Sequence, residues 1–480
     1  MGTDTINASI ADGAAAVTIK PLLSNVEVIN LSITDGNAAD NLVKLDLGDS
    51  TGVTDVALTL AADVTTSLNG VRAQNVTLKA GGATSVSTVA YSGLSSATDG
   101  GQDAKTINLA AIDLVTLTVA GVEELTLNAS GSAGDIDAIA VAALETLTIT
   151  GGITGGATKT FAVGTSGTNA DDAIEFDGLD LGETGLIDAK DSTGNITLVV
   201  DDSFSFTALG GVGKLTIANT SAGATGVSAT AAVTVTAGTG GIAATVEGGA
   251  NASTATKLTT VTITGADDAK DTVNIAAVVN PTDITSTALV DESKSTNATV
   301  TTGSGNDTIT IDAAVVSIDA GAGDDEITAG TGNDTITGGA GDDDFNALGV
   351  ASSSTVASAV SLTATIAAGD TLTFANGVDV VTDFTAGSDD IDVTTAAAVA
   401  VDDLVSAVST LTLVDNTNYI QYGSWNATTK VFTMAASFDA DASNDALFIE
   451  GDGSMTVTNA TGYVVLADMT AEIVTATDLI

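Results

Sequence analysis

Short runs of alternating apolar and hydroxyl residues recur through residues 1–300. Each run contains a triplet made of an apolar residue, then Thr or Ser, then a second apolar residue. Another apolar residue lies three positions before the start of the triplet, and Gly or another small residue usually follows it. A period of two predicts short strands whose hydroxyl side chains face outward. The clearest triplets are residues 31–33, 117–119, 125–127, 147–149, 215–217 and 261–263.

These runs are irregularly spaced, whereas a solenoid of identical coils holds a fixed period. Helical periodicity is nearly absent, and the best helical window, residues 396–408, is short and rich in Ala and Val. The chain is therefore expected to be all-β. Residues 1–300 are expected to form stacked β-strands of solenoid or sandwich type, in two or more units. A boundary is expected near residues 151–170, where Gly, Thr and Ser interrupt the runs.

From residue 302 the period becomes nine. Blocks begin at residues 302, 311, 320, 329 and 338, and all but the second carry Gly-x-Gly-x-Asp-x-apolar at fixed offsets. The glycines allow positive φ in a tight turn, and a three-residue strand with a central apolar residue follows. The turn residues are Gly303, Gly305, Asp307, Gly321, Gly323, Asp325, Gly330, Gly332, Asp334, Gly339, Gly341 and Asp343. The central residues are Ile309, Ile318, Ile327, Ile336 and Phe345.

Two such blocks complete one coil, so turns 18 residues apart stack about 4.8 Å apart. Asp307, Asp325 and Asp343 are then expected to line one edge, where Ca²⁺ between neighbours can take carboxylate and turn carbonyl oxygens. The spacing predicts two complete sites, Asp307/Asp325 and Asp325/Asp343. The opposite edge, with Asp334, is expected to be poor because the turns at 311–316 and 347–352 lack the motif. Four copies in register disfavour ordinary hairpin turns.

Residues 302–346 resemble the calcium-binding β-rolls of the repeats-in-toxin (RTX) family, and residues 378–392 resemble the segment that follows the roll in serralysin-like secreted proteins. The resemblance implies a parallel β-roll at 301–350, a C-terminal β domain at 351–480 with a type I secretion signal, and an extracellular location. No N-terminal leader is visible in Met1-Gly-Thr-Asp-Thr-Ile, so another export route and a fragment of a longer chain are both open.

The Thr-, Ala-, Val- and Asp-rich composition, with a roll near the C-terminus, resembles RTX-type bacterial surface-layer (S-layer) proteins. This resemblance implies self-assembly into a calcium-dependent lattice on the cell surface. Cell-envelope polysaccharide is a further expected partner, through a region that the sequence does not identify. The alternatives are a secreted adhesin or biofilm-matrix protein and, third, a polysaccharide-active enzyme.

The charge of the chain supports cations as ligands. Asp and Glu number 61 against 12 Lys and Arg, for a net charge of −49, while 44% of residues are hydrophobic. That hydrophobic fraction argues against disorder, and the charge calls for neutralising ions. Nucleic acid is not expected as a partner, because binding it takes clustered Lys and Arg. The sequence contains no run of about 18 apolar residues, so insertion of a helix into a membrane is not expected.

Catalysis is not expected. The chain has no His and no Cys, which excludes His-based zinc proteases, Ser-His-Asp triads and thiol nucleophiles. Tyr419, Tyr422 and Trp425 are expected to form a small core of the terminal domain, the alternative being a partner-binding patch. Asp-rich loops at 35–40, 169–172 and 267–271 are either solvated turns or further calcium sites.

Overall fold

The protein is described by a computed structural model in which every regular element is a β-strand, so the all-β prediction is confirmed for the part of the chain described. No helix among these residues is long and apolar enough to cross a membrane. The described residues are 2–11, 15–34, 42–61, 64–71, 75–81, 85–86, 88–92, 104–120, 122–131, 136–141, 145–153, 160–163, 185–193, 195–201, 206–220, 230–247, 257–266, 270–276, 297–311, 315–329, 333–346, 356–360, 367–374, 378–391, 398–401, 417–439, 444–450 and 462–469.

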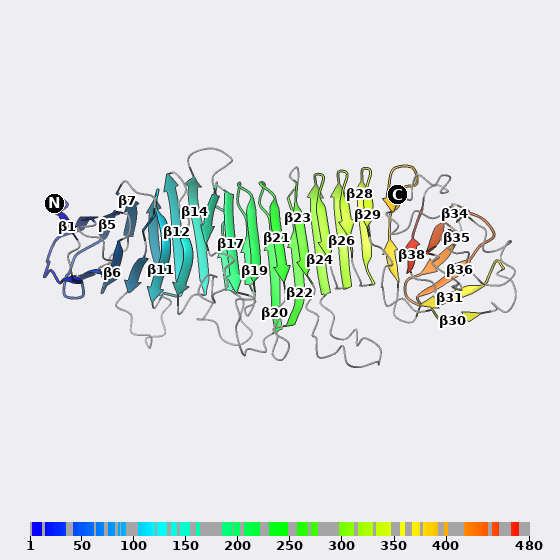
Figure 1. Ribbon diagram of the computed structural model, residues 1–480, viewed down its shortest axis with the longest axis horizontal. Coiled ribbons are helices and arrows are strands. Elements are labelled where there is room, and N and C mark those ends of the chain that lie inside the picture. The colour runs from blue at the N-terminus through cyan, green and yellow to red at the C-terminus, as the bar shows by residue number, and fades with distance from the viewer. Residues whose placement is uncertain are drawn as a thin grey trace. The chain divides into compact units, whose positions relative to one another are not determined.

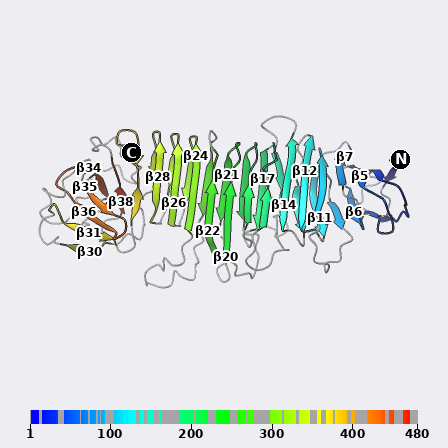
Figure 2. The same cartoon turned by 180° about the vertical axis from the view of Figure 1, so that it is seen from behind.

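The N-terminal unit, Met1–Leu258, is a parallel β-solenoid, in which the chain crosses from one sheet to the other as it advances (Figures 1 and 2). One sheet contains β1 (Thr5–Ala11), β3 (Val28–Thr34), β5 (Asp55–Leu60), β7 (Asn75–Ala80), β10 (Ala104–Ala110), β12 (Glu124–Gly131), β14 (Thr146–Ile153), β16 (Gly185–Asp188), β18 (Phe206–Leu209) and β20 (Thr230–Thr236). The other contains β2 (Val17–Ile19), β4 (Val43–Asp46), β6 (Thr65–Asn69), β8 (Ser85–Val86), β9 (Thr88–Ser92), β11 (Asp113–Ala120), β13 (Ile136–Val141), β15 (Thr160–Val163), β17 (Asn195–Asp201), β19 (Leu215–Thr220) and β21 (Ile242–Glu247).

Loop length explains the irregular spacing of the sequence runs. The number of residues per coil varies. Asn128 bonds to Asn108, 20 residues earlier, and Thr150 bonds to Asn128, 22 residues earlier. Leu147 and Ile187 pair on neighbouring coils although many more residues separate them in the chain. The strands remain in register through all these steps. Of the two architectures that the sequence left open for this region, the structure therefore shows a solenoid.

Alternating burial along each strand builds the solenoid core. In β3 the side chains of Ile29, Leu31 and Ile33 are buried, while their neighbours are partly exposed. Burying one such side chain stabilises the fold by about 1.5–3 kcal/mol. The outward positions stack as well, since Asn30 Nδ2 donates to Asn7 Oδ1 of the preceding coil at 2.9 Å.

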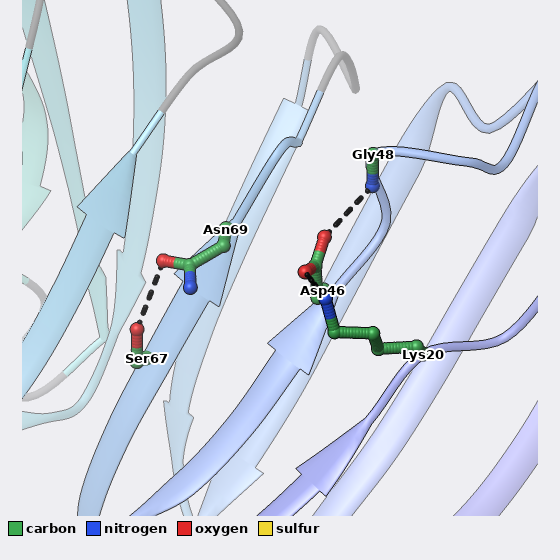
Figure 3. A network of polar contacts seen from close by, with 5 residues as sticks. All are labelled: Lys20, Asp46, Gly48, Ser67 and Asn69. Carbon is green, nitrogen blue, oxygen red and sulfur yellow. Dashed lines mark hydrogen bonds and ion pairs between the residues drawn. The ribbon is translucent and has the colours of Figure 1, made fainter.

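In one turn of this unit a lysine balances the negative charge of an aspartate (Figure 3). Asp46 Oδ2 lies 2.7 Å from Lys20 Nζ, and Asp46 Oδ1 accepts a hydrogen bond from the Gly48 N–H at 3.1 Å. The bond from Lys20 lowers the pKa of Asp46. This aspartate remains ionised without any bound cation.

The C-terminal unit, Thr259–Ile480, combines a parallel stack with a largely antiparallel sheet. One side of the stack contains β22 (Lys257–Thr264, which begins before the unit boundary), β24 (Asn297–Ser304), β26 (Val315–Ala322), β28 (Thr335–Ala340) and β32 (Asp379–Val381). The other side contains β23 (Thr272–Ala276), β25 (Thr308–Ile311), β27 (Glu326–Thr328), β29 (Asp344–Asn346) and β33 (Asp390–Ile391). We call these ten strands the roll. The five predicted central residues, Ile309, Ile318, Ile327, Ile336 and Phe345, are all buried in it.

Strand β32 connects the roll to the remaining strands, because it pairs in parallel with β28 on one side and with β38 (Gly462–Leu466) on the other. From β38 an antiparallel sheet continues through β37 (Asp445–Glu450), β35 (Thr417–Asn426), β36 (Val431–Met434), β31 (Thr371–Phe374) and β30 (Val356–Val360). We call these six strands the terminal sheet. A further strand, β34 (Ala398–Val401), pairs in parallel with β35 and lies in the window that was the best helical candidate.

The predicted burial of the aromatic residues is confirmed in the terminal sheet, but they do not form a single cluster. Tyr419 is buried in the apolar cluster of this sheet and Trp425 is partly buried against it, whereas Tyr422 is buried outside that cluster, with its ring 5.3 Å from that of Phe438. The rings of Trp425 and Phe374 meet edge to face with centroids 5.9 Å apart. The two tyrosines are therefore packing residues rather than an exposed patch.

The division of the molecule differs from the segment limits expected at residues 300 and 350. The compact units divide after Leu258, and the parallel stack extends past residue 350, because residues 378–391 return to it as β32 and β33. Residues 378–391, which their resemblance places after the roll, thus form its last coil. Most of the boundary expected at 151–170 and the extreme C-terminus from 470 lie outside the described residues.

Candidate metal centre

Three nonapeptide aspartates form a ladder along one edge of the roll, which we call the Asp325 edge. Each follows a glycine turn and precedes a strand, β25, β27 or β29. The Asp307 N–H donates to Asp325 Oδ1 at 2.7 Å, and the Asp325 N–H donates to Asp343 Oδ1 at 3.0 Å. The three side chains are 1–2% exposed. The step of 18 residues places them in the alignment that the nonapeptide period predicts.

The ladder continues by one aspartate at each end. The Asp271 N–H donates to Asp307 Oδ1 at 2.7 Å, and the Asp343 N–H donates to Asp389 Oδ1 at 3.2 Å. Asp389 was not predicted as a site residue because it lies outside the nonapeptide array, whereas Asp271 belongs to an Asp-rich loop for which the sequence left a solvated turn and a further calcium site open. Two signals in the sequence mark them: Asp271 closes the Asp-rich loop at 267–271, and Asp389 lies in the segment 378–392.

The carboxylates at the ends of the ladder differ from those in its middle. Asp271 Oδ2 accepts the Ala266 N–H at 2.8 Å, and Asp389 Oδ2 accepts the Thr385 N–H at 2.7 Å. By contrast, Asp307 Oδ2 and Asp325 Oδ2 are buried and have no hydrogen-bond partner. A buried carboxylate oxygen without a partner is strongly unfavourable. The middle of the ladder therefore offers two buried carboxylate oxygens that a cation can bind.

Glycines bring the backbones of consecutive turns close together along this edge. Gly321 has φ of 101° and Gly339 has φ of 112°, a region that other residues avoid. A Cβ atom would lie 1.9 Å from the Gly303 carbonyl oxygen if added to Gly321, and 1.7 Å from the Gly321 carbonyl oxygen if added to Gly339. Carbonyl oxygens of consecutive turns are thus stacked along the same edge as the carboxylates.

The other predicted turn glycines fall into three groups. Gly323 and Gly341 have positive φ as well, and a Cβ atom on either would lie within 2.2 Å of a carbonyl oxygen of the preceding coil. Gly305 donates its N–H to the Ala322 carbonyl at 2.7 Å. Gly330 and Gly332 lie outside the described residues.

The opposite edge, which we call the Asp334 edge, differs from its prediction. The Val316 N–H donates to Asp334 Oδ1 at 2.8 Å, so the preceding coil contributes no carboxylate, as expected. On the following coil, however, the neighbour is Asp379, whose Oδ1 accepts the Asp334 N–H at 3.0 Å. The expectation that residues 347–352 form this neighbouring turn is wrong. Among the described strands, the one that follows β28 in the stack is β32, and residues 347–352 themselves lie outside the described residues.

Burial dominates the electrostatics of both edges. It raises the pKa of Asp325 and of Asp343 to about 6, and neighbouring aspartates add to the effect. Burial, reinforced by the Asp379 carboxylate, raises the pKa of Asp334 to about 8. A bound cation has the opposite influence, because opposite charge favours the ionised carboxylate.

The donor atoms suit a hard divalent cation. Carboxylate and carbonyl oxygens are the ligands of Ca²⁺, which takes 6–8 of them at 2.3–2.6 Å. Among the described residues no group of three or more His, Cys, Asp or Glu side chains could hold a metal by itself. A complete shell therefore needs the stacked turn carbonyls in addition to Asp307, Asp325 and Asp343. A bound Ca²⁺ would supply the positive charge that keeps neighbouring coils together.

Comparison with known proteins supports this assignment. Residues 318–349 match a family model that describes four copies of the RTX calcium-binding nonapeptide repeat. No curated protein and no solved structure matches the chain. RTX repeats bind calcium and form β-rolls, and the proteins that carry them are typically secreted. The chain is thus an all-β protein that contains RTX calcium-binding repeats.

Proposed function

We propose that the chain is a structural surface-layer protein that assembles, through calcium, into a two-dimensional lattice on a bacterial cell. The observation that carries this proposal is the buried ladder of the Asp325 edge, in which Asp307 Oδ2 and Asp325 Oδ2 have no protein partner. An ion that completes this ladder contributes binding free energy to folding. Extracellular calcium modules bind in the range of about 10⁻⁴–10⁻³ M, so export would trigger folding.

Two features support assembly with copies of the same chain. The net charge of −49 opposes close association unless divalent ions neutralise the facing carboxylates. Strand β1 pairs with β3, and the edge of a β-strand can add a strand from another molecule. Calcium would then control both the fold of the subunit and its contacts.

The role we propose is non-enzymatic, and export by a type I system belongs to the same proposal. The absence of His and Cys from the sequence leaves catalysis to carboxylates, Lys and Tyr, and saccharide subsites usually add aromatic platforms. Only 3% of residues are aromatic. All four tyrosines of the chain are buried, namely Tyr91, Tyr419, Tyr422 and Tyr463.

A secreted adhesin or biofilm-matrix protein is equally compatible with RTX repeats. In that case calcium would order the chain, but the partner would be another surface rather than a second copy. The two functions differ in what the folded, calcium-loaded protein binds.

Electron microscopy of the purified full chain distinguishes these functions. Ordered sheets in millimolar calcium, which dissolve on chelation, are expected for the lattice protein. The D325N variant should fail to form them, whereas D344N, which removes an equal charge at an exposed position beside Asp343, should form them normally. A protein that folds in calcium but remains monomeric, and that binds glycans on an array, would instead support the adhesin.

A further inference from the structure

The Asp334 edge contains a pair of carboxylates that the nonapeptide array does not account for. Asp334 is 1% exposed and Asp379 is 0% exposed, and they occupy the same position on consecutive coils, since Thr335 pairs with Val380. Two buried carboxylates on neighbouring coils repel each other strongly when both are ionised, unless a cation lies beside them.

Two buried oxygens at this edge have no hydrogen-bond partner. They are Asp334 Oδ2 and Asn333 Oδ1, the latter from the residue just before Asp334. The pattern matches the middle of the Asp325 edge, where Asp307 Oδ2 and Asp325 Oδ2 are likewise without partners. Carboxylate and amide oxygens are both ligands for Ca²⁺. The unpartnered oxygens, rather than the acidity of the cluster, point to a binding site for a cation.

The strand that carries Asp379 also holds the terminal sheet. The Val380 N–H donates to the Asp334 carbonyl at 2.8 Å on the roll side of β32, and the Ala467 N–H donates to the Val381 carbonyl at 2.8 Å on its other side. The strand contains only Asp379, Val380 and Val381. Any force that separates β28 from β32 therefore acts on the junction between the roll and the terminal sheet.

A second aspartate fixes the chain just after β32 without an ion. Asp383 Oδ1 accepts the Gly338 N–H at 3.0 Å, and Asp383 Oδ2 accepts the Gly339 N–H at 2.8 Å. Both oxygens of this carboxylate are therefore used by the backbone. Of the two carboxylates that β32 and its following turn present to β28, Asp379 is the one that shares its edge with unpartnered oxygens.

We propose that Asp334 and Asp379, with the Asn333 side-chain oxygen, bind one further calcium ion that fastens the terminal sheet to the last coil of the roll. The site rests on calcium binding by the roll but lies on the opposite edge and uses a residue 45 positions from its partner. It makes the attachment of the terminal sheet, and not only the folding of the roll, dependent on calcium.

Native mass spectrometry of the full chain in calcium tests whether the two aspartates share an ion. D334N, D379N and the double variant D334N/D379N should each bind one ion fewer than D344N, the control at an exposed position. A single variant with the full number of ions, or a double variant that loses two ions, overturns the proposal. If the wild-type chain and D344N bind no calcium at all, the function proposed for the roll fails together with this site. If they bind calcium but the Asp334 and Asp379 variants lose none of it, only the site proposed here fails.

Hydrogen exchange of the wild-type chain gives a test that does not depend on whether a variant folds. Amides of β32 and β38 should exchange slowly in calcium and rapidly after chelation. In D379N they should exchange rapidly even in calcium, while amides of β27 remain protected. Equal protection of β38 with and without calcium in the wild-type chain would rule out the ion as the fastening element.

Discussion

The same residue type meets two opposite environments in this chain. Asp46 is partly exposed, lies 2.7 Å from the Lys20 ammonium, and has a lowered pKa. Asp325 is buried, has an oxygen without a partner, and has a pKa raised to about 6. The first carboxylate is neutralised by a side chain, which at an exposed site contributes little to stability. The second has a buried oxygen that the chain leaves without a partner, and this difference is why we expect calcium at the second turn and not at the first.

Substitution of single aspartates should reveal how the ions are shared. Asp325 belongs to both predicted sites on its edge, whereas Asp307 belongs to one, so D325N should remove two ions and D307N one. Affinity at a damaged site should fall by more than the roughly 10–100-fold typical for loss of an outer-shell partner. Isothermal titration calorimetry measures both quantities. Equal losses in D325N and D307N would contradict the shared arrangement.

Protons should replace calcium in the chelated protein. The folded-state pKa values of about 6 for Asp325 and Asp389 and about 8 for Asp334 lie above the ordinary value of 3.8. The folded state therefore binds protons more tightly than the unfolded state. This stabilisation is fully present below pH 3.8 and is lost as the pH rises through about 6 to 8.

Urea unfolding of the chelated protein at several pH values measures this effect. The midpoint should rise as the pH falls from 8 to 5, and the rise should be smaller in D325N, which has one titrating group fewer. Saturating calcium should flatten the dependence because the ion keeps the carboxylates ionised. An identical slope in D325N and the wild-type protein would assign the effect to general charge repulsion instead.

At the scale of elements, the turn between two strands sets how closely coils approach. Gly339 and Gly369 both have positive φ, 112° and 95°, but their surroundings differ. A Cβ atom on Gly339 would lie 1.7 Å from the Gly321 carbonyl oxygen, whereas one on Gly369 would meet nothing within 4 Å. The first glycine is needed for both conformation and space, and the second for conformation alone.

Alanine substitution separates these two requirements. G369A should cost about 1–2 kcal/mol, the price of a left-handed conformation for an L-residue. G339A should cost more, since the coil beneath it must also move. Chemical denaturation in saturating calcium measures both free energies of unfolding. A G339A protein no less stable than G369A would show that the close stacking of the turns contributes nothing.

Much of the fold at this scale follows from sequence, and its failures have a physical cause. The strict period of nine predicts the register of Asp307, Asp325 and Asp343, because equal steps of 18 residues place them at the same position of consecutive coils. Asp379 is 45 residues from Asp334 in the chain yet adjacent to it in space. The free energy of closing a loop grows only slowly with its length, so a long excursion can return to the stack, and sequence spacing does not reveal where.

For the whole molecule, the two units reach stability by different means. The N-terminal unit stacks buried branched side chains such as Ile29, Leu31 and Ile33, and its described turns include the ion pairs Lys20–Asp46 and Lys190–Asp188. The C-terminal unit places five aspartates in one ladder and two more on the opposite edge, all of them buried. Divalent ions are therefore expected to matter far more to the second unit than to the first.

Removal of calcium should accordingly unfold one part of the chain before the other. After chelation at neutral pH, amides of β26–β29 in the roll should lose protection within the time that amides of β10–β14 in the N-terminal unit remain protected. Circular dichroism should show a partial, not complete, loss of β-structure. Hydrogen-exchange mass spectrometry locates the loss. If both units lose protection together, the N-terminal unit also depends on calcium, and the Asp-rich loops at 35–40 and 169–172, outside the described residues, become the first positions to test, by D40N and D171N.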